Sequence, residues 1–429
     1  MVKIFLVIMT SLYFFPLTFK ALPNTNTKML MAGIGLVIYI IQLAKGRSGT
    51  INKDMFFLSM CAAFVSLMGI ASMAYNSTPD DAYARYLLSM WVWVGGAYFL
   101  CFLIKSVHGH NSVLLVCNYL ISVCIIQCAL ALLFDMNHSI RDMIDIYIEQ
   151  GQDFLNAPKV KRLYGIGASL DVAGTRFAAV LIMIVFIMLN YNMDRKYFGL
   201  YIFSFIFITI VGNMIARTTS VGVIIALLYA LYISKFHTFH LSSVGCRLWV
   251  WMSCAILITI PFVVVAYNTV PEFYRNLRFG FEAFFNFIEE GEWYTASTDT
   301  LKSMYEFPNA LKTWIIGDGY FANPINVDPY YTGKITGGFY KSTDVGYLRF
   351  IYYFGLIGLV AMCTVMYKAC FICVRKLRKN TFLFVMLLIL NYVIWLKVST
   401  DIFLVFALFL MVDRKEDDAF MERIVLKEQ

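Results

Sequence analysis

Long apolar runs recur along the chain, and they limit its fold more than any other feature of the sequence. A helix needs about 20 apolar residues to cross the hydrocarbon core of a bilayer, and about twelve runs approach that length. They predict an all-α polytopic membrane protein with about twelve transmembrane helices. The predicted spans lie near residues 2–19, 29–44, 55–74, 87–104, 112–134, 173–191, 197–213, 217–233, 248–268, 344–367, 381–397 and 400–412.

The composition agrees with that class of fold. Hydrophobic residues make up 60% of the chain and charged residues only 14%, whereas a typical soluble domain contains about 25% charged residues. No repeat, low-complexity linker or separate soluble domain interrupts the pattern. We therefore expect residues 1–429 to form a single integral membrane domain. Its first apolar run lacks an A-x-A cleavage site and is expected to remain as a helix.

The distribution of lysine and arginine predicts the orientation of the helices. Short loops such as "KGRSGTINKD" (45–54) and "RKLRKN" (375–380) are basic, and basic loops usually face the cytoplasm. The tail at residues 413–429 then lies on the cytoplasmic side, and the loops at 135–172 and 269–343 lie on the opposite side. This bias explains most of the net charge of +8. The expected partner of the basic surface is therefore the anionic lipid of the bilayer, and not nucleic acid.

The longest predicted loop contains amphipathic segments. In residues 271–294, apolar side chains recur at helical spacing and predict a helix on the membrane surface. A second helix is expected over residues 297–314, with an interruption at Pro308 and a glycine-rich turn at 315–324. The apolar positions of the first segment are Phe273, Leu277, Phe281, Phe284, Phe285 and Ile288.

The same two long loops contain no cysteine and no DxD motif. They also lack the cluster of histidine and cysteine side chains that many metal sites use. We therefore expect no disulfide framework, no metal ion and no cofactor, so that arginine side chains would supply the positive charge of any site.

Charged side chains gather at the predicted outer ends of the helices. Snorkelling to the membrane interface explains a single arginine well and four arginines less well. The other interpretation is that the arginines bind a phosphate-bearing ligand, because the planar guanidinium group matches phosphate oxygens and stays charged. These residues are Arg162, Asp171, Arg176, Arg217, Asp344 and Arg349.

Four motifs and the long loop follow one another in an order that resembles the Wzy-type O-antigen polymerases of bacteria. The motifs are "RLYGIGASLDVAGTRFA" (162–178), "ARTTSVG" (216–222), "GDGY" (317–320) and "TDVGYLRFIYYFGLIGL" (343–359), and the long loop begins after the second motif and contains the third. The resemblance covers residues 160 to 360, whereas the first five predicted helices match the family only in hydropathy. The same superfamily contains the O-antigen ligases.

The resemblance implies a GT-C-like glycosyltransferase fold and a place in the bacterial inner membrane, with the active site facing the periplasm. The implied reaction transfers a growing glycan from undecaprenyl diphosphate to the terminal sugar of a new lipid-linked repeat unit. It also implies a chain-length regulator and a flippase as partners.

The resemblance assigns roles to individual residues. Arg217 would bind the leaving diphosphate, with Arg162, Arg176 and Arg349 in support. Asp344 would act as a base or orient the acceptor, although an N-cap of the tenth predicted helix explains it equally well. Because Asp344 and Arg349 are five positions apart, we expect them to have separate partners. Asp318 and Tyr347, in the last two motifs, are further substrate-binding candidates.

Two alternative functions are an O-antigen ligase, which would transfer glycan to lipid A-core, and a flippase or other transporter. A ligase of this superfamily is expected to have a functional histidine in the long outer loop, and residues 269–343 contain none. A transporter more often has two related halves and charges near the middle of the membrane. Here the halves differ and the charges lie toward one predicted face.

Overall fold

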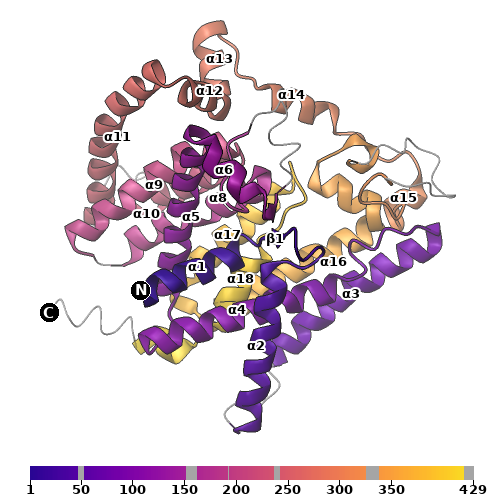
Figure 1. Ribbon diagram of the computed structural model, residues 1–429. Coiled ribbons are helices and arrows are strands. Elements are labelled where there is room, and N and C mark those ends of the chain that lie inside the picture. The colour runs from indigo at the N-terminus through magenta and orange to yellow at the C-terminus, as the bar shows by residue number, and fades with distance from the viewer. Residues whose placement is uncertain (47–52, 151–161, 192, 236–241, 325–337, 420–429) are drawn as a thin grey trace. The chain divides into compact units, whose positions relative to one another are not determined.

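The computed structural model describes residues 1–46, 53–150, 162–191, 193–235, 242–324 and 338–419 (Figure 1). Regular structure among them is almost entirely helical, which confirms the all-α class. The only strands in these ranges are β1 (Thr18–Phe19) and β2 (Ile148–Glu149), which pair antiparallel. Parts of the predicted loops at 45–54, 135–172 and 269–343 and of the tail at 413–429 lie outside the described residues.

Each predicted span contains a helix. Within the described ranges, eight helices are long and apolar enough to cross a membrane, namely α2 (Thr27–Ala44), α3 (Lys53–Asn76), α4 (Tyr86–His108), α5 (Val113–Met136), α8 (Leu170–Asn190), α9 (Arg195–Ile215), α11 (Ser243–Thr269) and α16 (Gly346–Lys376). The other spans correspond to shorter helices, α1 (Val2–Phe14), α10 (Thr219–Ile233), α17 (Thr381–Ile394) and α18 (Phe403–Met411). The long helices indicate a membrane-embedded protein, and the number of twelve crossings stays a prediction.

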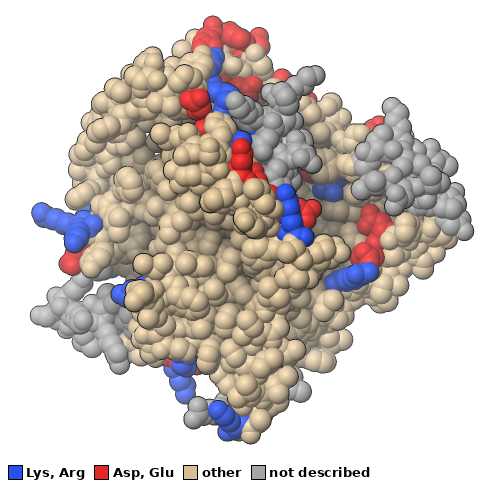
Figure 2. Space-filling model, in the orientation of Figure 1, with Lys and Arg blue, Asp and Glu red and all other residues tan. Residues whose placement is uncertain are grey.

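The surface agrees with this conclusion. Figure 2 shows that large areas of the visible face carry no charged side chain. On α11, three large apolar side chains are strongly exposed, with Leu257 at 69%, Ile258 at 64% and Phe262 at 73%. A soluble protein rarely exposes so much contiguous apolar surface, but a bilayer covers it.

Shorter helices fill the long predicted loop. The expected helix at 271–294 is two helices, α12 (Pro271–Gly280) and α13 (Glu282–Glu290), because Phe281 leaves the helical conformation with φ −118° and ψ 27°. The expected second helix is likewise divided into α14 (Ala296–Ser303) and α15 (Leu311–Ile315), with Pro308 between them. The other short helices in the described ranges are α6 (His138–Asp145), η2 (Tyr340–Ser342) and η3 (Arg378–Asn380).

The contacts divide the chain into two compact units. The first unit comprises residues 1–31, 96–293 and 411–429, and the second comprises residues 32–95 and 294–410. Each unit is described by itself below. The single membrane domain expected over residues 1–429 stays a prediction.

The core of the first unit is built around α8. Nearly every side chain from Ala173 to Met188 is buried, as expected for a helix that is apolar on all sides. It packs against α5, α9 and α10. Small residues allow the closest of these approaches, since a Cβ added at Gly222 of α10 would lie 2.3 Å from the Cα of Ala178.

The second unit is organised by a break in α16. This helix was expected to be continuous, but Phe354 and Gly355 have non-helical backbone angles, and Gly355 has φ 71°. The break turns the carbonyl of Tyr353 toward the "GDGY" turn, where it accepts a hydrogen bond of 3.1 Å from the Gly319 amide. The Tyr352 carbonyl likewise accepts from the Asp318 amide at 2.6 Å. Two motifs that are separate in the sequence are therefore hydrogen-bonded to each other.

Candidate functional site

The loop that precedes α8 is fixed by a buried glutamine of α5. The Gln127 side chain is 2% exposed; its Nε2 donates to the Ile166 carbonyl at 2.9 Å and its Oε1 accepts from the Ile166 amide at 2.8 Å. The hydroxyl of Tyr164 donates to Asp145 Oδ2 at 2.7 Å. These bonds hold the backbone between Arg162 and the start of α8, and so they position the first motif.

The second motif forms the turn between α9 and α10. Its Thr218 hydroxyl donates to Asp171 Oδ1, in the first turn of α8. Arg217 lies between the C-cap of α9 at Ala216 and the N-cap of α10 at Thr218, outside both helices. The hydrogen bond to Asp171 therefore ties the motif at 216–222 to the motif at 162–178.

Two arginines from these motifs meet on one aromatic ring. The Cζ of Arg162 lies 4.1 Å from the centroid of the Phe279 ring, and the Cζ of Arg217 lies 4.2 Å from the same centroid. Arg217 also donates from Nε to the Phe279 carbonyl at 2.8 Å and forms an ion pair with Glu282. A cation over a ring face is stabilised by the ring quadrupole. The structure thus brings Arg162 and Arg217 together, as their expected shared role requires.

Helix α12 places Phe279 by packing tightly on its neighbours. A Cβ added at Gly280 would lie 2.9 Å from the backbone carbon of Asn213, so the close approach to α9 requires glycine. Asp135, at the end of α5, accepts from Asn276 Nδ2 at 2.5 Å and from Arg275 Nη2 at 3.1 Å. These contacts fix α12 against both helices.

The charges in this cluster are balanced. Burial lowers the pKa of the Arg217 guanidinium, and the nearby Glu282 carboxylate opposes that shift. Burial also lowers the pKa of the Arg162 guanidinium, and Asp171 and then Glu282 oppose that shift. Both arginines nevertheless stay protonated, because a guanidinium group does not lose its proton in proteins. A phosphate that binds here therefore competes with a carboxylate that already pairs with Arg217.

Sequence reasoning missed Phe279 and Glu282. Both lie in the segment whose apolar face was assigned to the membrane surface, and Phe279 is outside that set of apolar positions. The available signal was an aromatic residue off the apolar face and between charged residues, with Arg278 before it and Glu282 after it.

Arg176 lies elsewhere in the first unit. Its side chain is only 7% exposed, and its Cζ lies 5.3 Å from the centroid of the Phe15 ring and 5.9 Å from that of Phe14. Both rings belong to the end of α1. The structure gives Arg176 its own aromatic surroundings and does not place it over the Phe279 ring.

In the second unit, Arg349 is 9% exposed and lies between aromatic side chains. Its Cζ is 3.7 Å from the centroid of Phe321 and 4.6 Å from that of Phe339. Its Nη2 donates to the Phe321 carbonyl at 3.0 Å and its Nη1 donates to Ser399 Oγ at 3.1 Å. Within the described part of the chain, the buried Nε has no hydrogen-bond partner.

Asp344 and Arg349 form an ion pair, so the expectation of separate partners is wrong. Asp344 Oδ1 lies 3.7 Å from Arg349 Nη1. The spacing rule for helices does not apply, because α16 begins at Gly346 with Val345 as its N-cap and Asp344 precedes it. For the same reason Asp344 is not the N-cap.

The last two candidates are held by contacts within the second unit. Asp318 accepts hydrogen bonds from the Thr313 hydroxyl at 2.7 Å and from the Tyr340 hydroxyl at 3.2 Å, and Lys312 Nζ lies 2.9 Å from its Oδ1. The hydroxyl of Tyr347 donates to the Tyr392 carbonyl at 2.9 Å. Both side chains thus support the fold around the third and fourth motifs.

Comparisons with other proteins do not add to this geometry. No family model matches the chain. No curated protein matches its sequence, and no solved structure matches it. In the described ranges, no group of three or more His, Cys, Asp or Glu side chains could hold a metal ion. The expectation of chemistry without a metal stays a prediction.

Proposed function

We propose that the protein is an O-antigen polymerase, a glycosyltransferase that joins lipid-diphosphate-linked repeat units of a surface polysaccharide. The observation that carries the proposal is the convergence of Arg162 and Arg217 on Phe279. Both arginines belong to motifs that resemble the Wzy-type family, and both lie outside the membrane-spanning helices. Two adjacent guanidinium groups suit the negative charge of a leaving diphosphate.

The proposed reaction replaces one bond at the anomeric carbon. The acceptor hydroxyl oxygen attacks that carbon, the bond to the diphosphate oxygen breaks, and its electron pair leaves with the diphosphate. Arg217 and Arg162 stabilise the charge that develops on the leaving oxygen. The phosphate must compete with Glu282 for Arg217, and an arginine that exchanges a carboxylate for a phosphate keeps its hydrogen bonds satisfied.

Asp344 is the proposed acceptor-side residue. Its carboxylate is 22% exposed and lies at the start of α16, so a sugar hydroxyl can reach it. By the family resemblance, Asp344 would take the proton of the acceptor hydroxyl or orient that hydroxyl, and Arg349 holds the carboxylate in place. This role rests on the resemblance and on the geometry of the second unit by itself. Tyr347 supports this end of α16 through its hydrogen bond to Tyr392, and Asp318 ties the "GDGY" turn to α15 through Lys312.

The cellular setting follows from the family resemblance. We propose a GT-C-like fold in the bacterial inner membrane, with the long loop at residues 269–343 in the periplasm. The donor and the acceptor are glycans on undecaprenyl diphosphate. A flippase supplies them, and a regulator sets the chain length.

A direct assay tests the proposal. Purified protein in lipid nanodiscs is incubated with the lipid-diphosphate-linked repeat unit from the cells that naturally express it, and the products are separated by size. A ladder of longer glycans supports a polymerase, and its absence with a correctly inserted protein rejects one. Transfer to lipid A-core indicates a ligase. Movement of the intact lipid across a bilayer, with no new glycosidic bond, indicates a flippase.

Matched arginine variants localise the reaction. Arg217→Ala is expected to abolish the ladder. Arg278→Ala is the control, because Arg278 is in the same region but pairs with the exposed Glu289. Equal loss in both variants would mean that the effect is not specific to the Phe279 cluster.

A further inference from the structure

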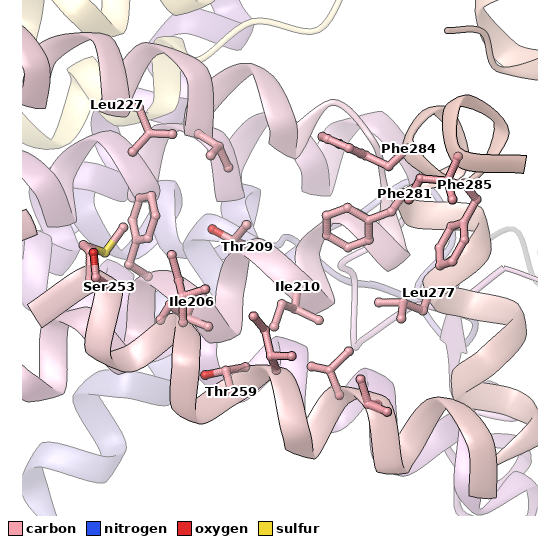
Figure 3. A pocket seen from close by; sticks show the side chains of 18 of the residues that line it. Ile206, Thr209, Ile210, Leu227, Ser253, Thr259, Leu277, Phe281, Phe284 and Phe285 are labelled. Carbon is pink, nitrogen blue, oxygen red and sulfur yellow. The ribbon is translucent and has the colours of Figure 1, made fainter. Parts of the chain in front are cut away.

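A cavity of about 620 Å³ lies in the first unit, between α9, α10, α11 and the α12–α13 pair (Figure 3). Its volume is in the range of small-molecule sites. None of the described residues that line it is charged. The lining residues are Phe205, Ile206, Thr209, Ile210, Val223, Leu227, Trp249, Met252, Ser253, Ile256, Thr259, Ile260, Val263, Val264, Leu277, Phe281, Phe284, Phe285 and Ile288.

The lining selects for a hydrocarbon ligand. Hydroxyl groups are few, and the Thr259 hydroxyl already donates to the Ala255 carbonyl of its own helix at 2.8 Å. A polar ligand would lose its hydrogen bonds to water on entering and would find few replacements. The walls at α9 and α11 are helices long enough to span a membrane. We therefore expect a lipid chain to enter the cavity from the bilayer.

One structural element connects the cavity to the arginine cluster. Leu277 of α12 lines the cavity. The ring of Phe279, two positions later, contacts the guanidinium groups of Arg162 and Arg217. Phe281 then lines the cavity again, and the next residue, Glu282, pairs with Arg217. The α12–α13 pair thus contributes side chains both to the apolar cavity and to the cationic cluster.

We infer that the cavity binds the hydrocarbon chain of a lipid whose phosphate group lies at Arg162 and Arg217. The expected ligand is a polyprenyl diphosphate, because it combines one long apolar chain with a compact anionic head. A phospholipid has two chains, and a second chain would need space outside this cavity. The identity of the lipid rests on the proposed function, whereas the cavity itself does not.

Photo-crosslinking tests the inference on the full chain. The protein is reconstituted in phosphatidylcholine nanodiscs with either a polyprenyl diphosphate that carries a diazirine in its chain or a phosphatidylglycerol that carries one in an acyl chain. After irradiation, mass spectrometry identifies the labelled peptides. The polyprenyl probe is expected to label α9 and α11 at the lining positions.

Three isoleucines of α11 provide matched variants. Ile256 and Ile260 line the cavity, whereas Ile258 does not and is 64% exposed. Ile256→Trp and Ile260→Trp place a bulky ring in the cavity and are each expected to reduce labelling by the polyprenyl probe about tenfold. Ile258→Trp is expected to leave labelling unchanged. Size-exclusion profiles confirm that each variant is folded.

Each outcome decides one question. Equal labelling in all three variants would overturn the cavity as the binding site. Equal labelling of the same peptides by phosphatidylglycerol would overturn the inferred ligand and indicate a general lipid site. The labelling does not depend on turnover. If it behaves as expected while no glycan ladder forms, the chain site stands and the proposed polymerase activity fails.

Discussion

Arg217 contacts both the backbone and the ring of Phe279, which is 62 positions away in the chain. Its Nε donates to the Phe279 carbonyl at 2.8 Å, and its Cζ lies 4.2 Å from the ring centroid. One contact needs the geometry of a guanidinium group and the other needs its delocalised charge. A lysine at position 217 would lack the planar group that makes both contacts.

The first prediction therefore concerns the geometry at position 217. Arg217→Lys keeps the positive charge but loses the planar guanidinium group, and Arg217→Ala loses both. In the polymerisation assay we expect both variants to lose at least about a hundredfold in rate, as when one donor to a developing negative charge is removed. Unchanged expression and size-exclusion profiles are required of both. Full activity of the lysine variant would show that charge alone is sufficient.

The second prediction concerns the Phe279 ring. Phe279→Leu removes the surface that holds Arg162 and Arg217, and a cation over an aromatic ring contributes about 0.5–2 kcal/mol. We expect KM for the lipid-linked donor to rise about tenfold, with a smaller change in kcat. Phe287→Leu is the control, since Phe287 is 53% exposed and packs against Trp293. Equal effects of the two substitutions would remove the ring from the site.

The third prediction is a gain of binding. Glu282 pairs with Arg217, so Glu282→Gln removes a competitor for the phosphate group. We expect this variant to bind a polyprenyl diphosphate more tightly, measured as a lower Kd by microscale thermophoresis in detergent. Glu289→Gln breaks the Arg278 ion pair on the same helix and is expected to leave Kd unchanged. Weaker binding by Glu282→Gln would mean that Glu282 orients Arg217 for the ligand instead of competing with it.

The sequence predicted the helices well because apolar runs of this length have few alternatives to a membrane helix. It predicted that four arginines gather near one face of the membrane. Two of them, Arg162 and Arg217, share one ring, whereas Arg176 packs against Phe15 and Arg349 belongs to the second unit. The sequence did not reveal Phe279, because contacts between distant segments depend on packing, here the close approach of Gly280 to α9. The pairing of Asp344 with Arg349 was missed because the helix boundary was placed too early.

The fourth prediction separates a chemical role of Asp344 from a structural one. Val345 is the N-cap of α16, so Asp344→Asn should not weaken the helix start. Removing a base is expected to reduce the polymerisation rate about a hundredfold or more, with normal protein levels. Asp81→Asn is the control, because Asp81 forms an exposed ion pair with Arg85 in the same unit. Full-length polymer from Asp344→Asn, in cells that lack the wild-type protein, would exclude Asp344 from the chemistry.

The fifth prediction tests the break in α16, where the "GDGY" turn is bound. Gly355 has φ 71°, and a Cβ added there would lie 2.1 Å from the Ile315 carbonyl oxygen. Gly291 has a similar φ of 77°, but an added Cβ would meet no atom within 4 Å. The two glycines share a positive φ, but Gly291 has ψ 4°, in the left-handed helical region, whereas Gly355 has ψ −172°, in a region that essentially only glycine adopts. Gly355 therefore differs from Gly291 both in backbone strain and in the space around it.

Gly291→Ala should therefore lower the free energy of unfolding by only about 1–2 kcal/mol, because alanine is strained in the left-handed conformation. That corresponds to a fall of roughly 2–8 °C in the melting temperature for a domain of 150–250 residues. Gly355→Ala forces alanine into a backbone conformation that essentially only glycine adopts, and it adds an overlap with backbone atoms that cannot move aside without displacing α15 from α16. We expect it to lower the melting temperature much further, or to prevent recovery of folded protein, when both variants are followed by size-exclusion thermostability in detergent. Equal melting temperatures for the two variants would mean that α15 does not pack against Gly355, and the link between the third and fourth motifs would then be lost.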